Sequence, residues 1–354
     1  MFRFRQLFFI IGLVAVSACH RPDNASPEPE HFAVTAPANL GGVVPHPDRN
    51  PFTREGVELG RMLFYDPILS GNNKISCATC HSPQKAFSDG VALASHGISG
   101  QPLHRHAPAL QNLAWHKGWF WDGGASDIES LNFGPITHPD EMGQNLQELE
   151  KELQNHPQYP ALFKAAFRSD TITAIHVTRA LAQFQRTLIS ANSRYDKFVR
   201  KEAGGQLSVQ ELEGRQLFQQ KCGSCHATDF FTDQSYRNNG LDPSFSADHE
   251  ALAWGRGRIT ERPEDIGKFK TPTLRNIALT APYMHDGRFA SLDAVLEHYR
   301  SGVQQSATLD PVLQQNGTPG IAMTEAEKAS IIQFLNTLTD PEFISNPKFL
   351  APKP

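Results

Sequence analysis

Three stretches of the chain have the spacing and the caps of amphipathic helices. Over residues 174–188, apolar residues recur at alternating steps of three and four, which predicts a helix with one apolar face. Ser208 and Glu211 form a capping box that starts a second helix, and Thr324 with Glu327 starts a third that stops near Pro341. Strand patterns are scarce. The expected fold class is therefore mainly α.

The first twenty residues have a different pattern. Arg3 and Arg5 precede an apolar run over 7–16, which is too short to cross a bilayer comfortably but suits the h-region of a signal peptide. We therefore expect a signal peptide over 1–18 and an exported, periplasmic protein. The run ends in Val16-Ser17-Ala18-Cys19, which resembles a lipoprotein processing box with Cys19 as the acylated residue. Ordinary cleavage after Ala18 is the alternative.

The segment that follows, over 19–48, contains many prolines and few periodic apolar residues. It is expected to be a flexible tether. A lipid on Cys19 would then be the chain's link to a membrane, because no other segment predicts one. The formal net charge of −4 provides no basic field, so a nucleic-acid partner is not expected.

Four of the five cysteines lie in a repeated motif. Cys77-Ala78-Thr79-Cys80-His81 recurs as Cys222-Gly223-Ser224-Cys225-His226. Two cysteines separated by two residues and followed directly by histidine are typical of c-type haem attachment, with thioethers from the cysteines and a proximal iron ligand from the histidine. A zinc site would need further Cys or His pairs nearby, and a redox disulfide would not need the histidine twice. The motif predicts two covalently bound haem c groups, with His81 and His226 as iron ligands.

The chain of 354 residues is long enough for two domains, and two motifs 145 positions apart (222 − 77) fit one haem in each domain. A weak repeat, Gly60-Arg61-Met62-Leu63-Phe64 and Gly214-Arg215-Gln216-Leu217-Phe218, precedes the two motifs. In cytochrome c-like domains a helix enters the attachment motif in this way. We therefore expect two such haem domains, over 49–195 and 196–345, with the haems facing their interface.

Further segments around the haem motifs resemble, in their order, those of bacterial di-haem cytochrome c peroxidases and the related MauG proteins. The resemblance covers roughly residues 52–338. The matching segments are Ala86-Phe87-Ser88-Asp89-Gly90, Ala107-Pro108-Ala109-Leu110-Gln111-Asn112, Phe120-Trp121-Asp122-Gly123, Gly134-Pro135-Ile136, Glu141-Met142-Gly143, Thr271-Pro272-Thr273-Leu274-Arg275-Asn276 and Thr280-Ala281-Pro282-Tyr283-Met284-His285-Asp286-Gly287.

The resemblance implies roles for particular residues. The haem on His81 would be the peroxide site, and the haem on His226 would store an electron or a hole. Trp121 would relay charge between them, although a buried packing aromatic is the alternative. Glu141 would be the distal acid that first accepts and then returns a proton of the peroxide, with Asp140 as a competing candidate.

The chain also departs from the peroxidase pattern near both haems. A distal glutamine is replaced by Leu131, and the loop histidine that closes the first iron is replaced by Ile98, with His96 nearby as a substitute. Loss of the glutamine should weaken the ordering of peroxide or water over the first iron. Loss of the histidine favours an open first iron over one bound by His96. The far ligand of the second haem is expected to be Tyr299, as in MauG, because a phenolate stabilises ferric and higher iron. Met284 and His298 are the rival ligands.

A calcium ion between the domains is usual in the family. The asparagine that helps to hold it is here His106, a poor ligand for a cation that prefers oxygen. The carbonyls of Thr280 and Pro282 remain available, so the sequence leaves calcium open.

The leading functional hypothesis is reduction of hydrogen peroxide at the first haem. Electrons would come through the second haem from a small periplasmic donor, a c-type cytochrome or a cupredoxin. A MauG-like, peroxide-dependent oxidase of a partner protein or substrate is the close alternative. A di-haem electron carrier without catalysis is the third interpretation.

Overall fold

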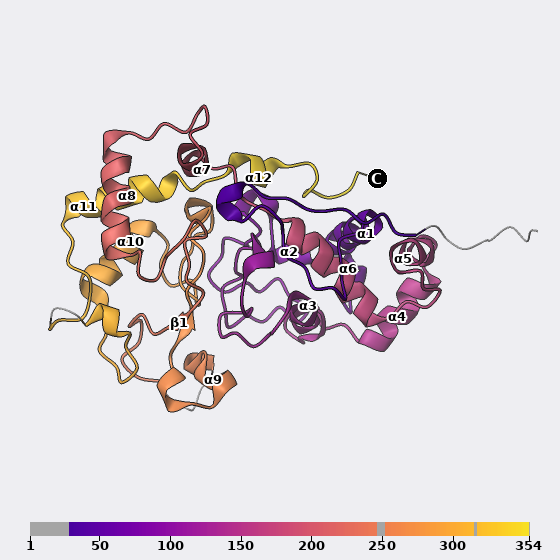
Figure 1. The fold of residues 1–354 in the computed structure, drawn as a ribbon. Coiled ribbons are helices and arrows are strands. Elements are labelled where there is room, and N and C mark those ends of the chain that lie inside the picture. Colours follow the sequence, from indigo (N-terminus) through magenta and orange to yellow (C-terminus); the bar gives the residue numbers. More distant parts are fainter. Residues whose placement is uncertain (1–27, 246–251, 315–316, 354) are drawn as a thin grey trace, which may run out of the picture.

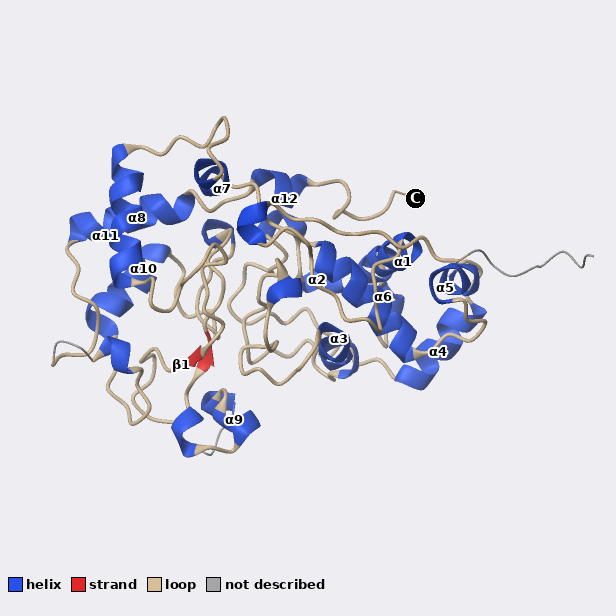
Figure 2. Ribbon diagram, in the orientation of Figure 1, coloured by secondary structure: helices blue, strands red, loops and turns tan. Residues whose placement is uncertain are grey.

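The computed structural model describes residues 28–245, 252–314 and 317–353, and helices and loops make up almost all of it (Figures 1 and 2). Within these ranges the strands form a single pair, β1 (Tyr236–Arg237) antiparallel to β2 (Phe269–Lys270). The expected mainly α class is confirmed. The predicted signal peptide and Cys19 lie outside the described residues. Among the described helices, none has the length and apolar character needed to cross a membrane.

The α-helices follow the predicted caps. Ser208 and Glu211 form a capping box at the start of α8, and Thr324 and Glu327 form one at the start of α11. The helix expected over 174–188 begins after the cap Thr173. The helices are α1 (Arg54–Tyr65), α2 (Cys77–Cys80), α3 (Ile128–Thr137), α4 (Leu146–Asn155), α5 (Tyr159–Phe167), α6 (Ala174–Thr187), α7 (Arg194–Val199), α8 (Val209–Lys221), α9 (Gly257–Thr260), α10 (Leu292–Glu297), α11 (Glu325–Asn336) and α12 (Pro341–Ser345).

The weak sequence repeat corresponds to a repeated helix crossing. α1 packs across α6, and α8 packs across α11. A Cβ on Gly60 would lie 1.9 Å from the carbonyl oxygen of Ala180, and a Cβ on Gly214 would lie 1.9 Å from that of Ser330. Each glycine therefore allows two helix backbones to approach more closely than any other residue would.

Buried apolar side chains gather in two large clusters, one around each crossing. The first includes Phe64, Phe87 and Phe184, and the second includes Phe218, Phe231 and Phe334. The ring centroids of Phe64 and Phe184 are 5.4 Å apart, and those of Phe218 and Phe334 are 5.3 Å apart. Cys77 packs against the first cluster and Cys222 against the second, so each haem motif has its own core.

The C-terminal segment returns to the first cluster (Figure 1). Phe343 of α12 lies with its ring centroid 5.6 Å from that of Phe87, and the Tyr65 hydroxyl donates to the carbonyl of Phe349 at 2.6 Å. The domain bounds expected from the sequence assign residues up to 345 to the second domain. The end of the chain nevertheless completes the core of the first cluster.

A buried ion pair joins α7 to the loop that follows β2. Arg275 donates to both carboxylate oxygens of Asp196, at 2.9 and 2.8 Å, and the two side chains are 1% and 0% exposed. Burial alone would raise the pKa of Asp196, but the hydrogen bonds and charge of Arg275 outweigh it and hold this pKa below its usual value.

Candidate active site

The two attachment motifs hold their histidines in the same way. The Nδ1 of His81 lies 2.7 Å from the carbonyl oxygen of Phe87, and that of His226 lies 3.0 Å from the carbonyl of Phe231. A carbonyl only accepts, so each Nδ1 carries the hydrogen and each Nε2 keeps its lone pair for a metal. Phe87 and Phe231 have positive φ angles of 62° and 53°. Their left-handed backbone is a strain typical of functional positions.

The four cysteines of the motifs form no disulfides. Cys77, Cys80, Cys222 and Cys225 are all unpaired and partly buried. Burial is the main cause that raises the pKa of Cys77 and Cys222 to about 12. Each motif thus places two cysteine side chains next to an imidazole whose Nε2 is free. This arrangement fits a covalently attached haem in each motif, with one protein ligand on each iron.

The structure places Glu141 beside the first motif. Glu141 follows α3, and its N–H donates to the carbonyl of His138 at 3.0 Å. Burial raises the pKa of Glu141, while the nearby His138 opposes this. The charge of Glu141 in turn adds to the raised pKa values of Cys77 and Cys80, after the larger effect of burial. A carboxyl group in this position is close to where the first haem would attach.

Ile98 contacts the Glu141 loop directly. Its N–H donates to the carbonyl of Glu141 at 2.8 Å, and its Cδ1 lies 2.1 Å from where a Cβ on Gly143 would stand. Leu131 is partly buried against the first cluster, and His96 is exposed. The place where the peroxidase pattern has a histidine thus carries an aliphatic side chain, which cannot bind a metal.

Tyr299 and Met284, two of the three candidate ligands for the second haem, both contact the side-chain amide of Asn239. Asn239 Nδ2 is 3.4 Å from the hydroxyl of Tyr299 and 3.4 Å from the sulfur of Met284. Burial raises the pKa of Tyr299 to about 12, against a hydrogen bond from Asn239, and the thiols of the second motif add to the rise. His298 Nε2 is 3.0 Å from the Asn239 carbonyl, so this ring is already engaged.

Tyr299 lies in an unusual backbone segment. α10 continues into a π-helical turn over His298–Gly302, and such turns occur frequently at functional sites. Sequence analysis identified Tyr299 and Met284 but missed Asn239, since no motif marks the position of that amide.

Trp121 lies where the two halves of the chain meet. Its Nε1 donates to the carbonyl of His106 at 2.9 Å, and its own carbonyl accepts from the N–H of Lys270, in β2, at 2.7 Å. The carbonyl of His285 accepts from the N–H of His106 at 2.8 Å, and the His285 ring stacks on Phe269 with centroids 3.6 Å apart. Trp121 is therefore fixed by residues from both halves.

His106 does not offer what calcium requires. The residue is 4% exposed, and the Nδ1 of its ring lies 2.8 Å from the carbonyl of Val91 and 3.6 Å from Asp89 Oδ1. Calcium takes six to eight oxygen ligands, so an imidazole that is already tied to a carbonyl does not fit the expected site.

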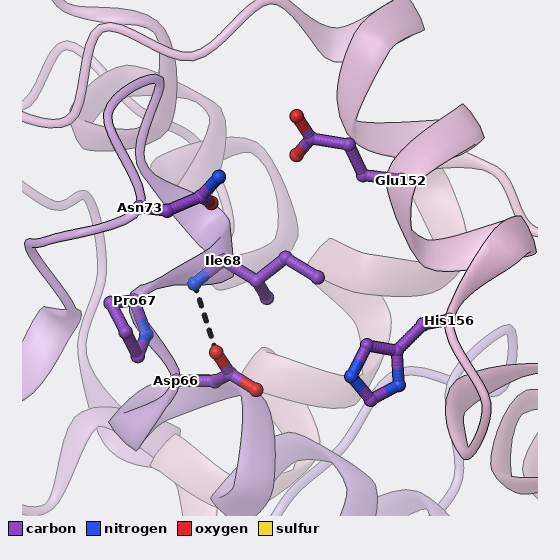
Figure 3. Close-up of a pocket in the computed structure, with 6 residues that line it drawn as sticks. All are labelled: Asp66, Pro67, Ile68, Asn73, Glu152 and His156. Atoms are coloured by element: carbon purple, nitrogen blue, oxygen red, sulfur yellow. Dashed lines mark hydrogen bonds between the residues drawn. The ribbon is translucent and has the colours of Figure 1, made fainter.

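Two cavities differ in their relation to the haem motifs. One, of about 330 Å³, is lined by Asp66, Pro67, Ile68, Asn73, Glu152 and His156 (Figure 3). Its lining residues lie outside both haem motifs, and Asp66 is already bonded to Ile68 N and to the Tyr159 hydroxyl. The other, of about 570 Å³, reaches His226 between Phe218, Phe231 and Tyr195.

Comparison with protein families agrees with this geometry. A family model described as di-haem cytochrome c peroxidase matches residues 54–204. The methylamine utilization protein MauG of Methylorubrum extorquens is 37% identical over 346 residues, covering 95% of this chain and 94% of the relative. Cytochrome c551 peroxidase of Nitrosomonas europaea is 37% identical over 248 residues, covering 70% of this chain and 73% of the relative.

Solved structures support the same assignment. A MauG-like protein associated with microbial copper homeostasis is 32% identical with a TM-score of 0.79, covering 93% of this chain and 97% of the other. The di-haem peroxidase BthA of Burkholderia thailandensis, at 23% identity and a TM-score of 0.71 over 93% of this chain and 96% of the other, shares the fold. The chain belongs to the family of di-haem cytochrome c peroxidases and MauG proteins, which carry two haem c groups, and it is an oxidoreductase that acts on a peroxide.

Proposed function

We propose that this protein reduces hydrogen peroxide at the haem attached to Cys77, Cys80 and His81. The observation that carries the proposal is the half-buried Glu141 carboxyl, with its raised pKa, beside the first pair of thiols. When bound, the two haem irons supply the redox chemistry. The protein residues around them control protons, ligands and the path of charge.

Glu141 is proposed to transfer a proton between the two oxygens of the peroxide. Reduction of one peroxide to two waters consumes two electrons and two protons, and one oxygen must lose a proton before the other leaves as water. An ionised Glu141 accepts that proton and returns it to the leaving oxygen. Burial makes this carboxylate a stronger base than an exposed glutamate, and the aliphatic Ile98, which contacts the Glu141 loop, has no side-chain atom that could bind the first iron.

Tyr299 is proposed as the far ligand of the haem attached to Cys222, Cys225 and His226. Its hydroxyl shares the Asn239 amide with Met284, which is consistent with both side chains facing the same haem. Trp121 then carries charge between the halves. The electrons come from a small periplasmic donor, either a c-type cytochrome or a cupredoxin.

A MauG-like oxidation of a partner protein is the second candidate function. Tyr299 near the second thiols and Ile98 in place of a loop histidine favour it. Relatives named MauG and relatives named cytochrome c peroxidase both match the chain. The donor decides between the two functions, because a peroxidase turns over with a reduced c-type cytochrome or cupredoxin whereas a MauG-like enzyme oxidises its partner's side chains.

The proposal includes the signal peptide, membrane anchor and domain bounds that the sequence predicts. A signal peptide over 1–18 directs export, and Cys19 links the protein to a membrane. Within the flexible tether expected over 19–48, the described residues include Leu40 and Val44, which are each 1% exposed, so this part of the segment packs on the protein. Haem domains follow over 49–195 and 196–345.

Glu141→Gln tests the proposed proton transfer, with Asp140→Asn as the matched control. We expect Glu141→Gln to lower the rate of reaction with peroxide by about 10²-fold to 10⁴-fold, because the amide cannot accept the proton. The wild-type rate should rise with pH through the raised pKa of Glu141, and this rise should disappear in the variant. Stopped-flow absorbance measures both.

Loss of activity in Asp140→Asn alone would assign the acid to Asp140. Two low-spin, six-coordinate haems that are inert to peroxide would contradict the proposed function.

A further inference from the structure

The two halves of the chain meet through a pair of equivalent backbone hydrogen bonds. The N–H of His106 donates to the carbonyl of His285 at 2.8 Å, and the N–H of Lys270 donates to the carbonyl of Trp121 at 2.7 Å. The same sequence offset separates His106 from Lys270 and Trp121 from His285. The contact therefore has an approximate two-fold symmetry, in which each half gives one donor and one acceptor.

The surrounding turns follow the same offset. Asn112 and Asn276 both have a φ of 55°, and each precedes a short 3₁₀ turn. The bridge between Trp119 and Ala125 corresponds to the bridge between Tyr283 and Phe289. His106 and Lys270 are thus structurally equivalent positions on the two sides of the junction.

Both side chains at these positions are buried and donate to a loop carbonyl. His106 is 4% exposed, and its Nδ1 lies 2.8 Å from the carbonyl oxygen of Val91. Lys270 is 8% exposed, and its Nζ donates to the carbonyl of Lys117 at 2.7 Å. Lys270 consequently binds the Trp121 loop twice, by its backbone N–H and by its ammonium group.

Cationic side chains lie close to Lys270 and to the adjacent Phe269. The Lys270 ammonium lies 5.6 Å from the ring centroid of Tyr236, and the Arg256 guanidinium lies 4.6 Å from the same centroid. Arg105 lies over Phe269 at 4.8 Å. Within the described ranges, His, Cys, Asp and Glu side chains form no group of three or more that would hold a metal ion. Asp89 Oδ1 lies 3.6 Å from His106 Nδ1, so one carboxylate is present beside this ring. A calcium ion at the position of the family's asparagine would nevertheless meet an imidazole nitrogen instead of an amide oxygen, and near Lys270 it would meet like charge.

We propose that this chain does not hold the calcium ion that is usual in the family, and that hydrogen bonds made by the backbone and side chains of His106 and Lys270 hold the Trp121 loop at the junction instead. The proposal depends on the relay role proposed for Trp121. It makes this enzyme independent of divalent cations, with Lys270 as a positioning residue for the relay.

Metal analysis of the holoprotein tests the first part. After purification in calcium-containing buffer we expect the iron of two haems and no bound calcium in each chain. The unfolding midpoint should be the same in excess calcium and in excess chelator. One calcium per chain, or a midpoint that rises with calcium, would overturn the proposal. Neither readout involves turnover, so the result holds even if the proposed peroxide reaction fails.

Lys270→Met tests the second part, with Lys268→Met as the matched control. Lys268 is a nearby cation that pairs with Asp265 at 3.2 Å and does not bind the Trp121 loop through its side chain. We expect Lys270→Met to slow electron transfer between the haems about tenfold or more, with haem content and ferric spectra unchanged, because the Trp121 loop loses one of its two bonds to Lys270. Lys268→Met should transfer electrons at the wild-type rate. Wild-type transfer in Lys270→Met would refute the positioning role.

His106→Asn restores an oxygen ligand at the other position. We expect its unfolding midpoint to become dependent on calcium. A variant with the wild-type transfer rate and no response to calcium or chelator would overturn the role of His106. If Lys270→Met fails to fold, the metal analysis of the wild type and His106→Asn still decide the proposal.

Discussion

His81 and His226 each direct their Nδ1 to a carbonyl a few residues later, and this contact is a residue-scale feature that spacing alone does not reveal. The motifs predict which imidazoles bind iron. The orientation of each ring depends on the left-handed backbone of Phe87 and Phe231, which no sequence preference marks because phenylalanine rarely adopts it.

Replacement of Tyr299 by methionine is the sharpest test of the second haem's ligand. A thioether favours the ferrous iron and a phenolate the ferric iron, so Tyr299→Met should raise the reduction potential of the second haem. Met284→Leu, which removes the rival that shares the Asn239 amide, should leave this potential unchanged. Spectroelectrochemical titration of both haems measures the two outcomes. An unmoved potential in Tyr299→Met would rule out Tyr299 as the ligand, and a shifted one in Met284→Leu would assign the ligand to Met284.

The site could be predicted from the sequence only in part. Glu141 and Trp121 were identified by resemblance, and the structure places Glu141 near the first thiols and Trp121 at the junction. Asn239 and Lys270 were missed, because their contacts join segments far apart in the chain. An isolated asparagine or lysine carries no local signal of such a contact.

At the scale of elements, caps and apolar spacing predicted helices well. The starts of α8 and α11 follow their capping boxes, since a cap satisfies backbone donors locally. The crossings of α1 with α6 and of α8 with α11 could not be predicted. They depend on a close approach between segments more than a hundred positions apart. In the sequence, Gly60 and Gly214 are visible only as part of a weak repeat, which does not show which helix each one meets.

Gly214→Ala tests the second helix crossing. The added methyl group would lie 1.9 Å from the Ser330 carbonyl oxygen, so α8 and α11 must separate. We expect a loss of about 3 kcal/mol in the free energy of unfolding. Gln216→Ala, at an exposed position of the same helix, should change it by less than about 0.5 kcal/mol. Chemical denaturation of the holoprotein measures both, and equal stability of the two variants would contradict the close crossing.

At the scale of the whole molecule, the buried pair Asp196–Arg275 joins α7, where the chain passes from the first half to the second, to the loop that follows β2. Asp196→Asn leaves the Arg275 charge buried and unpaired, so we expect a loss of about 3–5 kcal/mol. Glu202→Gln breaks the more exposed pair with Arg200 and should cost less than about 1 kcal/mol. Denaturation at neutral pH measures both variants, and similar losses would show that burial of the Asp196 pair adds nothing.

Acid should weaken the same pair. The folded pKa of Asp196 is lowered, so its contribution to stability is present above the unfolded value of about 3.9 and is lost as pH falls through the folded pKa. The stability of the wild type should therefore decrease more steeply in acid than that of Asp196→Asn. Parallel slopes for the two proteins would contradict the lowered pKa.

The position of Phe343 on Phe87 has a consequence for biosynthesis. A chain emerging from the ribosome in order presents Phe87 long before Phe343, yet these two rings lie 5.6 Å apart in the finished protein. The first apolar cluster is therefore translated early but is completed only when Phe343 has been synthesised. A nascent or prematurely terminated polypeptide would expose this apolar surface to chaperones and proteases.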